Sequence, residues 1–147
     1  MKAIQFSCFL LCISLMLLAQ PARADASQFI DLMPKSDAEV DLILSTLETA
    51  INDNQANGLP PIIMMLHGNQ AHRFVRRNYN ENKALVDQTA KLAAYGVLDV
   101  KICETWMRGN NYTNKDLFPF VNSVPLGSAE LERLSDEEGY SEYSVSM

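Results

Sequence analysis

The sequence lacks the residue patterns that build familiar metal and nucleotide sites. It contains three cysteines and two histidines in 147 residues, and none of them falls in a C-x-x-C or H-x-x-x-H spacing. Such spacings bring metal ligands together on one turn or one helix face. A glycine-rich phosphate loop, a serine nucleophile elbow and a pair of catalytic carboxylates are also missing from the sequence. We therefore expect no metal and no cofactor.

Basic residues are also scarce, with 12 against 18 acidic residues. The opening segment has the features of a secretory signal: Lys2 supplies a positive charge, residues 4–18 are mostly apolar, and Ala22-Arg23-Ala24 is a small-residue cleavage site. An uncleaved membrane anchor is the alternative, but about 15 apolar residues are short for a spanning helix. We therefore expect residues 1–24 to be removed and a periplasmic or secreted protein to begin at Asp25.

Removal of these 24 residues leaves 123, which is enough for one domain, 25–147, and too few for two. The mature chain loses two basic residues and no acidic ones, so its net charge changes from −6 to −8. A surface this acidic repels nucleic acid and anionic lipid headgroups, so we expect neither nucleic acid nor a membrane as a partner. Cys103 is then the only cysteine left, and no disulfide can form within the chain.

Strand and helix patterns alternate along the mature chain. Ser36 and Glu39 form a capping-box pattern, and apolar residues at helical spacing follow it. The run 62–66 is apolar without alternation, which is typical of a parallel strand covered on both faces. Helices are expected at 37–54, 70–77, 83–95 and from Gly127, and strands at 29–33, 62–66, 97–102, 120–124 and 140–145. This order predicts a three-layer α/β/α sandwich with a mostly parallel sheet of about five strands.

Polar residues follow two of these apolar strands at the point where each strand ends. His67 follows Leu66, and Cys103 follows Ile102. Ligands bind parallel sheets beyond the carboxyl ends of the strands, so we expect both side chains on one rim, within about 10 Å of each other. We expect three neighbours of this pair to contribute to binding: Gly68, Glu104 and Arg108.

Three of the basic residues lie close together in the sequence. Arg73, Arg76 and Arg77 have i, i+3, i+4 spacing, which predicts that they share one side of a helix. They form either a solvated face or a patch that contacts an anion or another subunit, and we assign Arg73 to the binding site. His72 is expected to be an exposed helix residue. Four aromatic residues are expected to cluster beyond the cysteine, where they pack in the core, cover the pocket or form a subunit contact: Trp106, Tyr112, Phe118 and Phe120.

The sequence leaves more than one role open for each residue of the pair. Cys103 is either a reactive thiol at a strand end or a small apolar core residue, as free cysteines commonly are. His67 is either a general base or a residue that caps the turn at Gly68. A copper(I) site is a further alternative, because thiolate, imidazole and thioether are soft ligands; the thioethers would come from Met64, Met65 and Met107.

Several short motifs taken together resemble the DsrE/DsrF-like proteins of sulfur metabolism. They span about two thirds of the mature chain and comprise His67-Gly68, Gly96-Val97, Ile102-Cys103, Asp116-Leu117, Val124-Pro125-Leu126-Gly127, Leu131 to Leu134 and Gly139-Tyr140. Members of this family are small α/β sandwiches that assemble into trimers or hexamers. In the sulfur-relay members, the cysteine at the position of Cys103 carries a persulfide. The resemblance implies a homo-oligomer in which Cys103 accepts sulfur beside His67.

We therefore expect an exported DsrE-like protein that carries or transfers sulfur as a Cys103 persulfide. Its partners would be a sulfur donor and an acceptor thiol or small molecule. The alternative is a non-catalytic oligomeric binding module with a pocket at the Cys103 and His67 rim for a small ligand or a partner segment. Whether the chain is an enzyme stays open, because the sequence shows no complete catalytic constellation.

Overall fold

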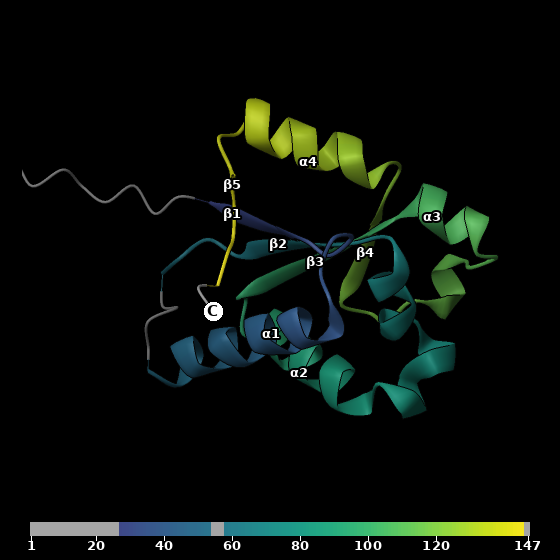
Figure 1. Ribbon diagram of the computed structural model, residues 1–147, viewed down its shortest axis with the longest axis horizontal. Coiled ribbons are helices and arrows are strands. Elements are labelled where there is room, and N and C mark those ends of the chain that lie inside the picture. The colour runs from purple at the N-terminus through teal and green to yellow at the C-terminus, as the bar shows by residue number, and fades with distance from the viewer. Residues whose placement is uncertain (1–26, 54–57, 146–147) are drawn as a thin grey trace, which may run out of the picture.

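The computed structural model of this chain describes residues 27–53 and 58–145 (Figure 1). Five parallel strands form one sheet in the order β4-β3-β2-β1-β5. The strands are β1 (Gln28–Asp31), β2 (Ile62–Leu66), β3 (Leu98–Cys103), β4 (Val121–Val124) and β5 (Ser141–Glu142). The helices are α1 (Asp37–Asn52), α2 (Lys83–Ala94), α3 (Glu104–Gly109) and α4 (Gly127–Asp136), with 3-10 segments η1 (Asn69–Phe74), η2 (Arg76–Glu81) and η3 (Asn114–Asp116). The expected three-layer α/β/α fold is confirmed.

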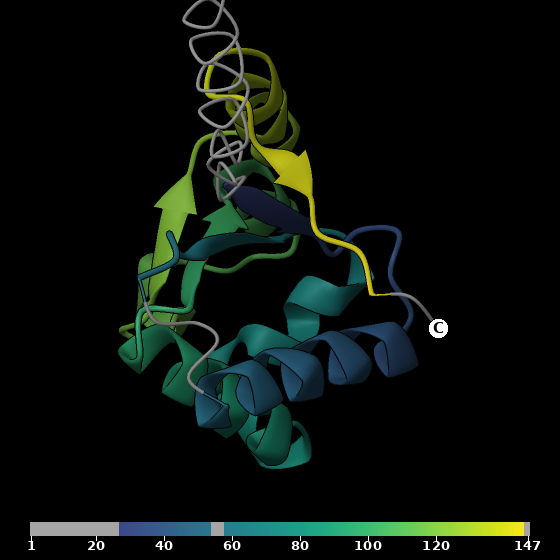
Figure 2. The same ribbon diagram turned by 90° about the vertical axis from the view of Figure 1, so that its left-hand side faces the viewer.

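Helices α1 and α2 cover one face of the sheet, and α4 covers the other (Figure 2). The chain advances from β1 through β2 and β3 to β4 in one direction across the sheet. It then returns through α4 to β5, which lies on the far side of β1. Right-handed crossovers that run in opposite directions place their helices on opposite faces, which explains the division of the layers.

Strand β2 is buried on both faces, as its apolar run predicts. Met64 and Leu66 belong to the larger core cluster, which includes residues of α1 and α2, whereas Ile63 and Met65 pack with residues of α4. Strand β3 alternates instead. Its fully buried residues face the larger cluster, and Lys101 on the opposite face reaches α4. One helix therefore covers the second face only in part, and β3 presents polar residues there.

Helix α1 begins where the capping box predicts. The Ser36 Oγ accepts a hydrogen bond from the Glu39 backbone N–H at 3.3 Å, and the Glu39 carboxylate accepts one from the Ser36 N–H at 2.8 Å. These bonds satisfy two backbone donors that the helix itself leaves free. The helix ends at Asn52, and its buried face consists of Val40, Ile43, Leu44 and Leu47.

The prediction of a helix at 70–77 is wrong, because two 3-10 segments, η1 and η2, occupy this region. Val75 separates them with an extended backbone (φ −106°, ψ 146°) and forms a β-bridge with Leu117. The Val75 side chain is fully buried. Extension of the chain at this residue inserts the side chain into the core, which a continuous helix would not allow.

The three arginines therefore do not share one side of a helix. Arg73 pairs with Asp41 of α1 at 3.2 Å, Arg76 donates to the Leu117 carbonyl, and Arg77 pairs with Asp116 at 3.3 Å. Each arginine binds a different neighbouring segment.

The prediction that His72 is exposed is also wrong. Its ring nitrogen Nδ1 lies 3.1 Å from the Tyr112 hydroxyl, and its ring packs edge-on against Trp106 at 4.8 Å between centroids. The expected aromatic cluster forms as two stacked pairs, Trp106 with Tyr112 at 5.4 Å and Phe118 with Phe120 at 5.6 Å. All four rings belong to the larger core cluster or pack against it, so core packing accounts for them.

Smaller differences concern the ends of the sheet. Strand β1 stops at Asp31 and not at 33, because the Asp31 carboxylate accepts a hydrogen bond from the Met33 N–H at 2.8 Å and turns the chain. Strand β5 takes only two residues of the expected 140–145, at the edge of the sheet. The expected signal segment, 1–24, lies outside the described residues. Within 27–53 and 58–145, no helix is long and apolar enough to cross a membrane.

Candidate functional site

Cys103 closes β3 at the point where the connections leave the sheet in opposite directions. The connection from β3 to β4 packs on the face covered by α1 and α2, since Met107, Tyr112 and Leu117 join that core cluster. The connection after β4 leads to α4 on the other face. In open parallel sheets such a divergence leaves a crevice at the carboxyl ends of the strands, where ligands bind. Cys103 therefore lies at the position that the topology favours for a site.

The strand register places His67 beside Cys103. Strands β2 and β3 are adjacent and parallel, and the last pair in register is Leu66 with Ile102. His67 and Cys103 come next on their two strands. Adjacent strands lie about 4.8 Å apart, so the two positions are neighbours at the ends of their strands. They lie at the same edge of the sheet, as the strand polarity predicts.

Both residues are more enclosed than a rim position suggests. Cys103 is 4% exposed and His67 is 8% exposed. A Cβ on Gly127, the first residue of α4, would lie 3.2 Å from the Cys103 Cβ and 3.2 Å from the Met65 Sδ. Glycine at this position lets the start of α4 approach the thiol. Among the hydrogen bonds of the described residues, none joins His67 to Cys103.

Asp31 completes the row of polar residues at this edge of the sheet. It ends β1, the other neighbour of β2, and its Oδ1 lies 2.6 Å from the His67 Nε2. Asp31 and Cys103 thus end β1 and β3, and His67 directly follows β2 between them. We did not single out Asp31 from the sequence. A signal for it was present, however, because Asp31 is a polar residue at the end of an apolar strand, as are His67 and Cys103.

The carboxyl group of Asp31 is held in its charged form. Partial burial raises its pKa, but hydrogen bonds from His67 and from the Met33 N–H, together with favourable electrostatics from His67 and Lys35, outweigh burial and lower the pKa below its ordinary value. At neutral pH, Asp31 is therefore an ionised hydrogen-bond acceptor beside the imidazole.

The other residues that we assigned to the site divide between two places. Glu104 and Arg108 lie next to Cys103 in α3, where Glu104 accepts a hydrogen bond from Ser123 at 2.8 Å and lies 3.8 Å from Arg108. Gly68 directly follows His67 with φ +66°. The guanidinium of Arg73 pairs with Asp37 and Asp41 of α1, and no hydrogen bond or ion pair among the described residues joins it to Cys103 or His67. No group of three or more His, Cys, Asp or Glu residues within the described ranges could hold a metal ion.

An ion-pair network joins α4 to β3 two residues before Cys103. Glu130 of α4 accepts hydrogen bonds from Lys101 at 2.7 Å and from Arg133 at 3.0 Å. The bonds from Arg133 lower the pKa of Glu130 most, burial opposes them, and Lys101 lowers it further, to about 2. The side chain of Glu130 is only 16% exposed. This network fixes the position of α4, whose first residue packs on Cys103.

Replacement of Glu130 by glutamine should destabilise the protein by about 1–3 kcal/mol at pH 7. The folded pKa lies below the unfolded value of 4.5, so the contribution is complete above about pH 5 and is lost as the pH falls toward about 2. Urea unfolding at several pH values should show the two proteins converging over this range. Glu132→Gln, at an exposed position of the same helix, is the control and should change stability little. A Glu130→Gln deficit that persists undiminished at pH 2 would contradict the assignment.

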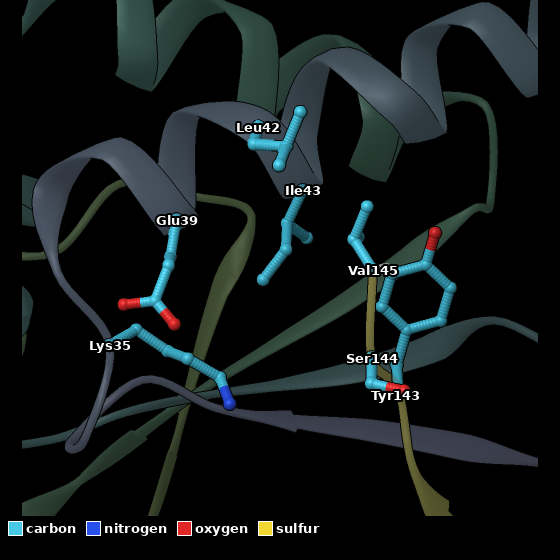
Figure 3. A pocket seen from close by; sticks show the side chains of 7 residues that line it. All are labelled: Lys35, Glu39, Leu42, Ile43, Tyr143, Ser144 and Val145. Atoms are coloured by element: carbon cyan, nitrogen blue, oxygen red, sulfur yellow. The ribbon is translucent and has the colours of Figure 1, made fainter. Parts of the chain in front are cut away.

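A separate pocket lies between α1 and the end of the chain (Figure 3). Lys35 and Glu39 form its charged part, and the apolar side chains of α1 face the C-terminal segment across it. Its volume is about 120 Å³, and its lining consists of Lys35, Glu39, Leu42, Ile43, Tyr143, Ser144 and Val145. Lys35 is paired with Glu142 at 2.8 Å, and Glu39 is used by the capping box. This pocket is lined by neither Cys103 nor His67.

Comparison with known proteins supports the fold alone. No family model matches the chain, and no curated protein matches it. Among solved structures, it is similar to MTH1491, a protein of unknown function from Methanobacterium thermoautotrophicum, with a TM-score of 0.57 and 17% sequence identity. The match covers 80% of this chain and 93% of that one. Both chains therefore share the α/β architecture.

Proposed function

We propose that this protein is a sulfur carrier that holds a persulfide on Cys103. The observation that carries the proposal is the placement of Cys103 and His67 as neighbours on one edge of the sheet, at the point where the connections diverge. A thiol beside an imidazole can lose its proton to the ring and react as a thiolate. The resemblance to DsrE-like proteins, in which the matching cysteine carries sulfur, points to the same chemistry.

The transfer exchanges one sulfur–sulfur bond for another. The Cys103 thiol gives its proton to His67, and the thiolate attacks the outer sulfur of a donor persulfide, R–S–SH. A bond forms between the Cys103 sulfur and this outer sulfur while the donor bond breaks. The leaving thiolate, R–S⁻, takes the proton from His67 and departs as R–SH. An acceptor thiolate removes the sulfur from Cys103 by the same exchange, and no external oxidant or reductant is needed.

The compartment, oligomeric state and partners that we propose rest on the opening segment, the family resemblance and the net charge of the sequence. The opening segment directs the chain to the periplasm or out of the cell, and the family resemblance favours a homo-oligomer, a trimer or a hexamer. The sulfur donor and acceptor are then thiols or small molecules of that compartment. The acidic surface argues against nucleic acid as a partner.

Incubation of the folded protein with polysulfide should add sulfur to Cys103 and to no other residue. Intact mass spectrometry should show an increase of one or more sulfur atoms, reversed by a reducing thiol. Cys103→Ala should gain no sulfur. We prefer alanine to serine because Cys103 is buried, so a serine hydroxyl there would risk an unpaired polar group. His67→Gln should slow loading, whereas His72→Gln, which changes the other histidine, should not.

The burial of Cys103 also supports a second function, a non-catalytic binding module with a packed cysteine. The pocket between α1 and the C-terminal segment would then be the ligand site. The binding module predicts that the native thiol resists both alkylation and sulfur loading until the protein unfolds. Native protein that gains no sulfur, while the unfolded chain does, would replace the carrier proposal with the binding module.

A further inference from the structure

Asp31 and His67 form a contact whose donor and acceptor can be assigned from the chemistry of the two groups. The Asp31 Oδ1 lies 2.6 Å from the His67 Nε2, and the side chains are 22% and 10% exposed. An ionised carboxylate can only accept hydrogen bonds, so the ring nitrogen must donate. When the imidazole carries a single ring hydrogen, this hydrogen therefore lies on Nε2, and the lone pair lies on Nδ1.

The second ring nitrogen is available for chemistry. Among the hydrogen bonds that the described residues form, His67 has the one to Asp31, and none involves Nδ1. His67 directly follows β2, and Cys103 ends β3, the adjacent parallel strand. A general base must reach the proton that it abstracts either directly or through one water, and the contact often tightens only when substrate is bound. Nδ1 is therefore the nitrogen that can serve as the base toward the thiol.

Asp31 is itself held in place by the backbone. The Met33 N–H donates to the same Oδ1 at 2.8 Å, which closes a turn directly after β1. The Lys35 charge also acts on this carboxylate from the β1–α1 loop. The carboxylate is thus oriented by the turn that ends its own strand, independently of His67.

We propose that Asp31 is a positioning residue for the sulfur transfer, which fixes the tautomer and orientation of His67 so that Nδ1 accepts the proton of Cys103. This inference takes the proposed persulfide function as its premise for the effect on rate, whereas the tautomer follows from geometry alone. When Nδ1 takes the proton, the positive charge that forms on the ring lies against the Asp31 carboxylate and is stabilised by it. Asp31 exchanges no proton with the substrate and touches neither sulfur.

The test compares Asp31→Asn with the wild-type protein and with Asp99→Asn. Asp99 lies on the same face of the sheet, near the start of β3, and so serves as the matched control. Asparagine removes the negative charge that holds the ring hydrogen on Nε2, and its amide N–H₂ can donate to Nε2 in turn; both effects move the hydrogen toward Nδ1 and remove the lone pair there. Nitrogen NMR of the imidazole should show Nε2–H in the wild type and in Asp99→Asn, and a shift toward Nδ1–H in Asp31→Asn. Polysulfide loading of Cys103 should slow by at least about tenfold in Asp31→Asn alone.

The two readouts separate this inference from the carrier function. If Asp31→Asn shifts the tautomer but loads at the wild-type rate, the positioning role is wrong and the carrier function stands. If no variant loads sulfur while the tautomers behave as described, the carrier function is wrong and the geometric assignment stands. A wild-type ring protonated on Nδ1 would overturn the assignment even if Asp31→Asn failed to fold.

Discussion

Replacement of Phe74 by alanine is expected to lower the free energy of unfolding by about 3–5 kcal/mol. Phe74 ends η1, is fully buried, and is among the largest of the buried side chains in the core cluster beneath the sheet. Removal of its ring leaves a cavity that the neighbouring residues fill only in part. Chemical denaturation should show the loss as a lower midpoint with an unchanged slope. Phe118→Ala, at a half-buried aromatic position, is the control and should cost clearly less.

The same variant reports how reagents reach Cys103. A loss of 3–5 kcal/mol raises the unfolded population between about a hundredfold and several thousandfold. If the thiol reacts only in unfolded molecules, its alkylation rate should rise by the same factor. If the thiol reacts through a local opening at the edge of the sheet, the rate should hardly change, because that opening does not involve Phe74. The first result favours the packed cysteine of the binding module, and the second favours the carrier.

The sequence predicts the fold well where local patterns and tertiary contacts agree. The unbroken apolar run 62–66 predicts a buried strand, and the capping box at Ser36 and Glu39 predicts the start of a helix. The structure shows both. The shared edge of His67 and Cys103 follows from the polarity of two adjacent parallel strands. These features depend on residues close in sequence or on the handedness of crossovers, which is nearly invariant.

The predictions fail where distant contacts decide the local structure. Residues 70–77 carry a helical pattern, but burial of Val75 and its bridge to Leu117, 42 positions later, extend the chain there. The position of Asp31 at a strand end could have been recognised, but its contact with His67 could not, because the two residues lie 36 positions apart. The burial of Cys103 depends on Gly127, which α4 brings back across the sheet. Periodicity in the sequence contains no information about such approaches.

Replacement of Gly68 by alanine is expected to destabilise the protein by about 2–4 kcal/mol, because two costs combine. Gly68 has φ +66° and ψ −160°, a region that is essentially restricted to glycine. An added Cβ would also lie 3.0 Å from the Met33 Cγ and 3.3 Å from the Met33 Cα. The methionine side chain can move aside, but its backbone atom belongs to the turn that holds the Asp31 carboxylate. Urea denaturation measures the loss of stability.

Two other glycines separate the costs at Gly68. Gly96 also has a positive φ, +72°, but nothing lies within 4 Å of an added Cβ, so Gly96→Ala should show the backbone cost alone, about 1 kcal/mol. Gly109 ends α3 without a positive φ and with open space around it, so Gly109→Ala should be neutral or slightly stabilising. If Gly68→Ala proves no more harmful than Gly96→Ala, the contact with Met33 does not constrain this turn. If it is more harmful, the Nε2–H signal of His67 should also weaken, because the displaced turn carries Asp31 away from the ring.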